Sequence, residues 1–331
     1  MSQYKLISIQ HGLEGTAGTG VAATFKWKGN GKFKFLDSVH TPELDYALGV
    51  LGGNVEGAFI GDTGSELTLE DTEMSAENLI WLLNGAVKSV PGAASTFAFT
   101  FPTTSANTIK TFTWEFATAS QEYEFAYGFI SKFGISGDVN SNNGRMMVNA
   151  VVNGRAASAS TVTSSLGFLA NHEPLNFNNA TLKIDAVGTA AGTASATAGT
   201  LKGFSLDCET GWTIDASRYA DGRSAKDFSA LTFTDYKLTG NLRILENATA
   251  VTQIANARAG TPIVVQITVS GSSSRAVKFN LPMVFTVPAD LGNDSNGLHV
   301  LEFPFTAGYS RTSTAQGPEI NITASASTTL S

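Results

Sequence analysis

The sequence predicts a mainly β protein made of two similar halves, each with one short α-helix beside its strands. Charged residues are only 15% of the 331 residues, whereas an average soluble domain has roughly 25%. Much of the polar surface must therefore come from Ser, Thr, Asn and Gly, which suit strands and turns. Apolar and polar residues also alternate with a period of two over many stretches, as in half-buried strands.

The alternation is clearest where aromatic or branched residues share one face of an expected strand. In the first half these residues are Phe97, Phe99 and Phe101; Phe112, Trp114 and Phe116; and Tyr123, Phe125, Tyr127 and Phe129. In the second half the stretches are 236–244, 263–269, 277–287 and 301–309. Short connections such as 270–274 and 290–297 separate them, which is typical of antiparallel hairpins.

Two segments have a helical pattern with a start and a stop signal. The first helix is expected to begin at the N-cap Thr72 and to stop at Gly85, and the second to begin at Asn247 and to stop at Gly260. The expected apolar stripes are Ala76, Leu79, Ile80 and Leu83 in the first helix, and Val251, Ile254 and Ala255 in the second.

The two helices are related by a constant shift of 175 residues along the chain (72 to 247, 76 to 251, 79 to 254 and 85 to 260). The preceding strands obey the same shift, since Leu67 and Leu69 map onto Leu242 and Ile244. A shift of about half the chain predicts an internal duplication. The alternative is a chance alignment of two strand–helix units, because the cap residues are common types.

The chain is long enough for two domains with separate cores. The stretch 156–203 is rich in Ser, Ala, Thr and Gly and has few aromatic residues, so it can bury little apolar surface. We therefore expect an N-terminal domain over 1–160, a connector over 161–202 with one strand at 180–184, and a C-terminal domain over 203–331. The Gly-rich stretch 12–20 is expected to be a flexible N-terminal arm.

No constellation in the sequence predicts an enzyme, a cofactor or a metal site. The four histidines are scattered, without HExxH or GxSxG, and each is expected to be exposed or hydrogen-bonded. Cys208 has no partner cysteine and is expected to be a buried apolar residue. The stretch 138–149 begins like a calcium loop, but Asn143 replaces the required Gly and Asn149 the bidentate Glu. An Asn/Gly turn between strands explains it with fewer assumptions.

Long connections and strand prolines are the candidates for contacts between subunits. The connections 37–64 and 209–229 are long for a compact domain, and such loops are usually functional. The candidate loop residues are Pro42, Glu43, Leu44, Asp45, Tyr46, Trp212, Arg218, Tyr219 and Arg223. The candidate sheet-edge residues are Pro282 and Pro304, because proline cannot donate to a β-ladder and marks free edges or bulges.

Several stretches, taken in order, resemble the major tail tube proteins of siphovirus-type bacteriophages. They are LEGTAGTGVAATFKW (13–27), FISKFGISGDV (129–139), EPLNFNNATLKI (173–184), GFSLD (203–207), LTGNLRIL (238–245) and LEFPFTAGY (301–309). The single motifs are weak strand patterns. Their order over residues 10–310 and the internal repeat carry the resemblance.

The resemblance implies two tandem β-sandwich or half-barrel domains, and rings that close by joining the sheets of neighbouring subunits. A duplicated subunit implies a trimeric, pseudo-hexameric ring, with the long loops mediating the stacking of rings into a tube. It also implies a place in the virion tail after assembly in the host cytoplasm. The implied partners are further copies of the chain and the tape measure, tail terminator and distal tail proteins, while genomic DNA passes through without specific binding. The net charge of −7 fits such a channel, since carboxylates repel DNA.

A second function class remains open at this point, an adhesin or carbohydrate-binding β-sandwich surface module. Such a module would be exported and often uses exposed aromatic residues or calcium. The N-terminal residues MSQYKLISIQHG have no charged leader followed by an apolar stretch, and no run of about 18 apolar residues occurs. We therefore expect neither a secretory signal nor a membrane span, which weighs against this alternative.

Overall fold

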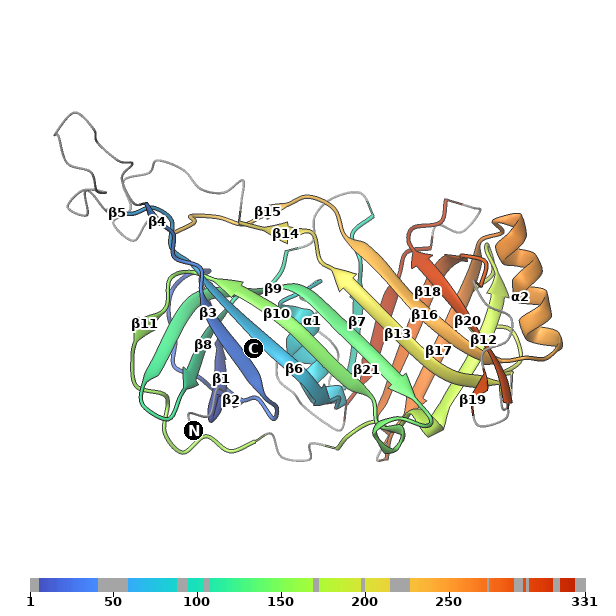
Figure 1. Cartoon of the computed structure of the whole chain (residues 1–331), viewed down its shortest axis with the longest axis horizontal. Helices are drawn as coiled ribbons and strands as arrows, with labels where there is room; N and C mark the ends of the chain where they lie inside the picture. Colours follow the sequence, from blue (N-terminus) through green and yellow to red (C-terminus); the bar gives the residue numbers. More distant parts are fainter. Residues whose placement is uncertain are drawn as a thin grey trace, which may run out of the picture.

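The computed structural model describes residues 6–40, 59–87, 95–103, 108–168, 173–197, 200–214, 227–272, 274–288, 294–295, 298–311 and 316–324. Large antiparallel sheets dominate these residues, together with the helices α1 (Ala76–Asn84) and α2 (Ala248–Ala259) and the short 3-10 helices η2 (Asn142–Gly144) and η3 (Phe177–Asn179) (Figure 1). The predicted mainly β class with two short helices is confirmed.

The strands follow the chain in two groups. The first group is β1 (Ser8–Leu13), β2 (Phe25–Lys26), β3 (Gly31–Phe35), β4 (Val39–His40), β5 (Phe59–Ile60), β6 (Ser65–Glu73), β7 (Thr96–Thr100), β8 (Phe112–Ala117), β9 (Glu122–Asp138), β10 (Met147–Gly154) and β11 (Ser158–Ala159). The second group is β12 (Ala180–Ala186), β13 (Leu201–Glu209), β14 (Trp212–Thr213), β15 (Thr232–Phe233), β16 (Lys237–Leu245), β17 (Ile263–Ser270), β18 (Ala276–Phe285), β19 (Asp294–Ser295), β20 (Leu298–Ala307) and β21 (Glu319–Thr323).

One continuous sheet crosses both halves of the molecule. Its strands lie in the order β3, β6, β10, the C-terminal part of β9, β13, β16 and β20, and we call them the long sheet. One face packs on the core through residues such as Leu67, Phe204 and Phe303, and the other face, the polar face, is partly or fully exposed. The halves are therefore joined by a β-ladder as well as by the connector.

The same order of strand pairing occurs twice. In the first half β1 pairs with β8, β8 with β9, β9 with β10, β10 with β6 and β6 with β3. In the second half β12 pairs with β17, β17 with β18, β18 with β20, β20 with β16 and β16 with β13. Single residues agree, because Leu67 lies opposite Phe33 and its counterpart Leu242 lies opposite Phe204.

Helix α1 begins about one turn later than the sequence predicts. Its N-cap is Ser75, whose hydroxyl accepts a hydrogen bond from the Asn78 amide at 3.1 Å. Thr72 still belongs to β6 and pairs with Val148 of β10, so the sheet ladder competes successfully with the expected cap. The predicted cap Asn247 and both stops are confirmed. The 175-residue shift thus holds for the strands and the helix ends but not for the helix starts.

Helix α2 buries a different face from the predicted one. Ala250, Gln253 and Ala257 are its buried residues, whereas Val251 is 58% exposed and Ala255 is also exposed. The helix is rich in Ala and Thr, so its sequence carries two weak stripes and the packing against β18 decides between them. By contrast, all nine residues of α1 are buried.

Candidate assembly interface

The ladder between β9 and β13 is the junction at which one half of the chain joins the other. Seven residue pairs form it, from Gly203 opposite Asp138 to Glu209 opposite Lys132. On the core face of the ladder, the buried side chain of Leu206 lies beside that of Ile135. On the polar face the Lys132 ammonium lies 2.9 Å from the Glu209 carboxylate. The junction therefore combines backbone pairing, apolar burial and matched surface charge.

The two ends of the long sheet are the counterparts of the two strands in this junction. At one end β3, the counterpart of β13, pairs only with β6 among the described strands. At the other end β18 and β19 pair with β20 as the C-terminal part of β9 pairs with β10. The ends lie far apart, with β3 on the left and β18 to β20 on the right of Figure 1. The molecule thus presents one half of its own junction at each end.

Apolar side chains are exposed at both ends. Phe35 at the end of β3 is 47% exposed, and Val284 and Val287 at the end of β18 are exposed as well. Alternate backbone amides of β3 face away from β6, because the Leu36 amide donates to Gly64 at 2.9 Å and successive amides of a strand point to opposite sides. The Phe35 amide therefore points away from β6, toward the open edge.

The polar face carries charges of both signs, and several of them form ion pairs. Its acidic members include Glu66, Glu70, Asp71, Glu73, Asp138, Asp207, Glu209 and Glu302, and its basic members include Lys32, Lys34, Lys132, Lys237, Arg145 and Arg243. The Lys32 ammonium lies 2.5 Å from the Glu70 carboxylate, and the Arg243 Nε lies 3.0 Å from the Glu302 carboxylate. Both signs therefore occur along this face, with the acidic side chains in slight excess.

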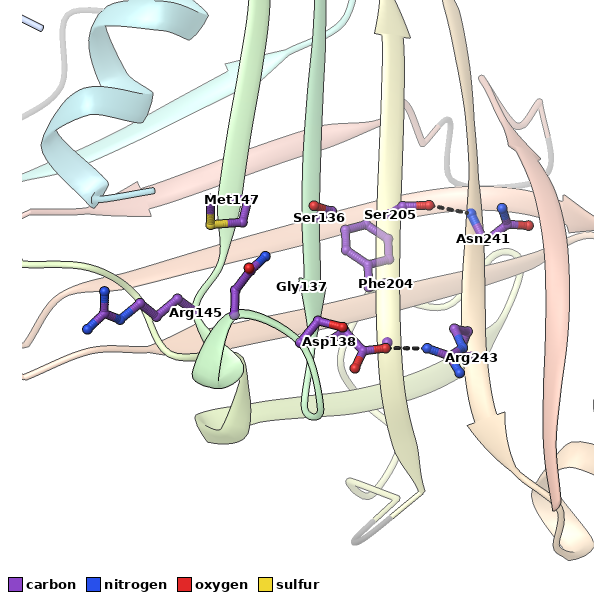
Figure 2. Close-up of a pocket in the computed structure, with 12 residues that line it drawn as sticks. Ser136, Gly137, Asp138, Arg145, Met147, Phe204, Ser205, Asn241 and Arg243 are labelled. Carbon is purple, nitrogen blue, oxygen red and sulfur yellow. Dashed lines mark hydrogen bonds and ion pairs between the residues drawn. The ribbon is translucent and has the colours of Figure 1, made fainter. Parts of the chain in front are cut away.

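A shallow cavity of about 240 Å³ opens on the polar face above the junction (Figure 2). Asp138 points to Arg243 and forms an ion pair with it, and the Asn241 amide donates to the Ser205 hydroxyl at 3.2 Å. Arg145 at the rim pairs with Glu73. Each charged side chain that lines the cavity, Asp138, Arg145 and Arg243, therefore has an ion-pair partner among the described residues.

The two long connections occupy the same place in the two halves. The first joins β3 to β6, and the second joins β13 to β16. Each begins as a two-stranded ribbon, β4 with β5 and β14 with β15, and both ribbons lie on the upper side of Figure 1. Trp212 pairs with Phe233 in the second ribbon. The other candidate loop residues, Pro42, Glu43, Leu44, Asp45, Tyr46, Arg218, Tyr219 and Arg223, lie outside the described residues.

The two candidate edge prolines lie where strand pairing changes. Pro282 is opposite Val264 of β17. On the other side of β18 the ladder with β21 ends at Asn280 and the ladder with β20 begins at Met283, so Pro282 lies between them. The Pro304 carbonyl accepts a hydrogen bond from the Thr286 amide at 2.7 Å. Pro304 therefore lies at the point where the ladder between β18 and β20 ends.

Two buried glutamates hold, by hydrogen bonds, segments that the sequence pattern does not predict to be packed. Glu14 accepts hydrogen bonds from the Gly18 and Tyr127 amides, both at 2.7 Å, and from the hydroxyls of Thr111 and Thr113. The Gly-rich stretch 12–20, expected to be a flexible arm, is instead anchored to β8 and β9. The only signal in the sequence was a lone acidic residue among small ones.

Glu115 plays the same part for the beginning of the connector. Its carboxylate accepts hydrogen bonds from the Ala23 amide and the Thr163 hydroxyl, both at 2.8 Å. β8 is consequently buried on both faces, where the sequence predicted a half-buried strand. Alternation alone cannot reveal that a distant loop covers the second face of a strand.

His11 lies in an aromatic cluster with Phe25, Trp81, Phe112 and Trp114, with ring centroids 4.9 to 5.7 Å from its own. Its Nδ1 has no hydrogen-bond partner among the described residues, which contradicts the expectation of an exposed or hydrogen-bonded histidine. Burial lowers its pKa to about 3, so the imidazole is neutral near pH 7.

The calcium-like stretch and the single cysteine are the remaining chemical candidates. Residues 139–146 of the calcium-like stretch form the turn between β9 and β10, with Asn142 and Asn143 at positive φ, which confirms the Asn/Gly turn. Cys208 is buried, as predicted, and burial raises the pKa of its thiol. Among the described residues no group of three His, Cys, Asp or Glu side chains is placed to hold a metal ion. Neither α1 nor α2 has the length and hydropathy of a membrane-crossing helix.

Comparison of the chain with protein-family models and with curated proteins finds no match. A functional proposal for this chain is therefore supported by its own strand pairings, exposed edges and charges, together with the resemblance of its sequence motifs.

Proposed function

We propose that this chain is a structural subunit that assembles head to tail with copies of itself into closed rings, which stack into the tail tube of a bacteriophage. The observation that carries the proposal is the junction between β9 and β13, because the counterparts of its two strands, β18 and β3, lie at opposite ends of the molecule. A neighbour that repeats the internal junction would cover both edges.

Ring closure also removes a hazard of the isolated chain. An exposed strand edge is a template for uncontrolled pairing, and a closed ring leaves no edge within its layer. The contact is heterologous, because β3 of one copy meets the β18–β19 end of the next. In the absence of closure the same contact would generate open filaments.

The repeated pairing scheme supports a ring of three chains. If the contact between chains reproduces the contact between halves, each chain supplies two equivalent units, and three chains give six. An internal duplication accounts for both the 175-residue shift and the repeated strand order. The resemblance to duplicated tail tube subunits implies the same ring.

The polar face of the long sheet would then line the channel. Its paired charges leave no basic stripe of the kind that grips phosphates, so DNA would pass without adhering. The ribbons β4–β5 and β14–β15 extend on one side of both halves, where their loops would contact the next ring. Placement in the virion tail, and the tape measure, terminator and distal tail proteins as partners, follow from the resemblance.

Electron microscopy of the purified chain over a range of concentrations tests the proposal. Rings or tubes of uniform diameter are expected, and native mass spectrometry of an isolated ring should give three chains. Six chains would contradict the pseudo-hexamer, whereas a persistent monomer that binds a glycan array would favour the adhesin alternative and end the tail tube proposal.

A proline at the open edge gives a sharper test. Because the Phe35 amide points away from β6, Phe35→Pro removes a donor only from the open edge. We expect a folded chain that no longer forms rings. Phe35→Ala is the matched control, since it also removes the phenyl side chain but keeps the backbone N–H. This variant should still assemble. Equal assembly by both variants would show that the β3 edge is not used.

A further inference from the structure

Helices α1 and α2 occupy equivalent places, but within the part of the chain that the structure describes only α1 is covered on its outer side. Strands β7 and β21 pack against α1. Arg275, in the turn between β17 and β18, donates to Glu77 of α1 at 2.8 Å. Both β21 and this turn belong to the second half of the chain. The second half therefore covers the helix of the first half, on the same side as the β9–β13 junction.

The uncovered face of α2 has an unusual composition for a surface helix. Its exposed residues are Ala248, Val251, Thr252, Ala255, Arg258 and Ala259. A helix face in water normally carries several charged residues, and this face has one. The equivalent positions of α1, shifted by 175 residues, include Ala76, Ile80 and Leu83, which are fully buried. The composition fits a face that another surface covers.

The elements that cover α1 have counterparts in the first half. The turn between β8 and β9, residues 118–121, corresponds to the turn between β17 and β18. Strand β11 pairs with β9 as β21 pairs with β18. Ala119, Ser120 and Gln121 are exposed, as are both residues of β11. This surface lies at the opposite end of the molecule from α2 (Figure 1).

We propose that the outer face of α2 binds the β8–β9 turn and β11 of the next copy in the ring. The inference rests on the proposed head-to-tail assembly and adds a second contact to it, on the core side of the sheet ladder. The occupant is a second copy because the internal junction already shows which elements cover this helix position. Small side chains on both surfaces allow the helix and the turn to approach closely.

Cysteine cross-linking tests this contact directly, because the native Cys208 is buried and gives little background. Thr252→Cys and Ala119→Cys are combined in one chain, allowed to assemble, and treated with a short bis-maleimide. Covalent dimers and trimers are expected on a denaturing gel. The matched control combines Thr252→Cys with Thr306→Cys, which is exposed on the polar face and should give no cross-linked product.

The outcomes separate the two proposals. Rings that form without a link between positions 252 and 119 would overturn the helix contact and leave the ring proposal intact. A failure of the unmodified chain to form rings would overturn both. When Phe35→Pro is added to the double-cysteine variant, the cross-link between chains should be lost while the melting temperature is retained. A cross-link that still forms, but within a single chain, would contradict a contact between copies.

Discussion

The two halves of the molecule share a strand order and differ in their interiors. The first half buries Gln10, His11, Glu14, Glu77 and Glu115, and most of these side chains hold a segment that is distant in sequence. The second half has a core built mainly from Val, Ile, Leu and Phe, and its helix is open on one side. The same order of strand pairing thus supports two different arrangements: the first half fastens other segments of the chain, and the second half has a helix with one exposed face among the described residues.

Breaking the link between the halves should have the largest effect on stability. Arg275 is 4% exposed and pairs with Glu77 and Glu173. Arg275→Met would leave Glu77 buried without its partner, which costs about 3–5 kcal/mol. Urea unfolding measures this loss. The double variant with Glu77→Met should recover most of it, and a single variant no less stable than the double one would refute the role of the pair.

Loss of the Glu14 anchor should have the next largest effect. Glu14→Gln keeps the shape but places an amide nitrogen against amide and hydroxyl donors, so we expect a loss of about 2–3 kcal/mol. Glu302→Gln on the polar face is the control and should cost less than about 1 kcal/mol. Equal losses in the two variants would mean that burial of the anchor does not matter.

The buried histidine makes the first half sensitive to acid. The pKa of His11 is lowered from 6.5 to about 3, so between these values the unfolded chain binds a proton that the folded chain does not. Stability from this group is complete above about pH 6.5 and falls as the pH drops toward 3, by about 2 kcal/mol at about pH 5. In the His11→Phe variant, the difference in the free energy of unfolding between about pH 5 and about pH 7 should be smaller by this amount. An unchanged difference would show that His11 does not cause the sensitivity to acid.

The long loops should affect folding least. Replacing residues 41–58, or separately 215–226, with a short Gly-Ser linker leaves both ribbons in place and should change the free energy of unfolding by less than about 1 kcal/mol. Rings should persist while tubes shorten or disappear in electron micrographs. Normal tubes from both replacements would show that these loops do not mediate stacking.

The sequence reveals the features of this fold that depend on local pattern. Alternation locates the strands, and Asn247 and Gly260 correctly bound α2. Thr72 misleads because its role depends on pairing with Val148, and Val251 misleads because an Ala-rich helix has no strong face. The internal junction, the Glu14 anchor and the covering of α1 all join residues far apart in sequence, which no periodicity reports. The sequence names Pro282 and Pro304 as candidate edge residues, but it does not indicate which strands lie beside them.

Strand β21 has a consequence for the timing of folding. It lies between β18 and β7, and so places residues 319–323 beside residues 96–100. A chain emerging from the ribosome makes its early segments first, so β7 must wait for more than two hundred further residues before its neighbour exists. Such distant pairing slows folding. It also means that the first half acquires its final form only after residues 319–323 have been synthesised, because until then β7 lacks this neighbour.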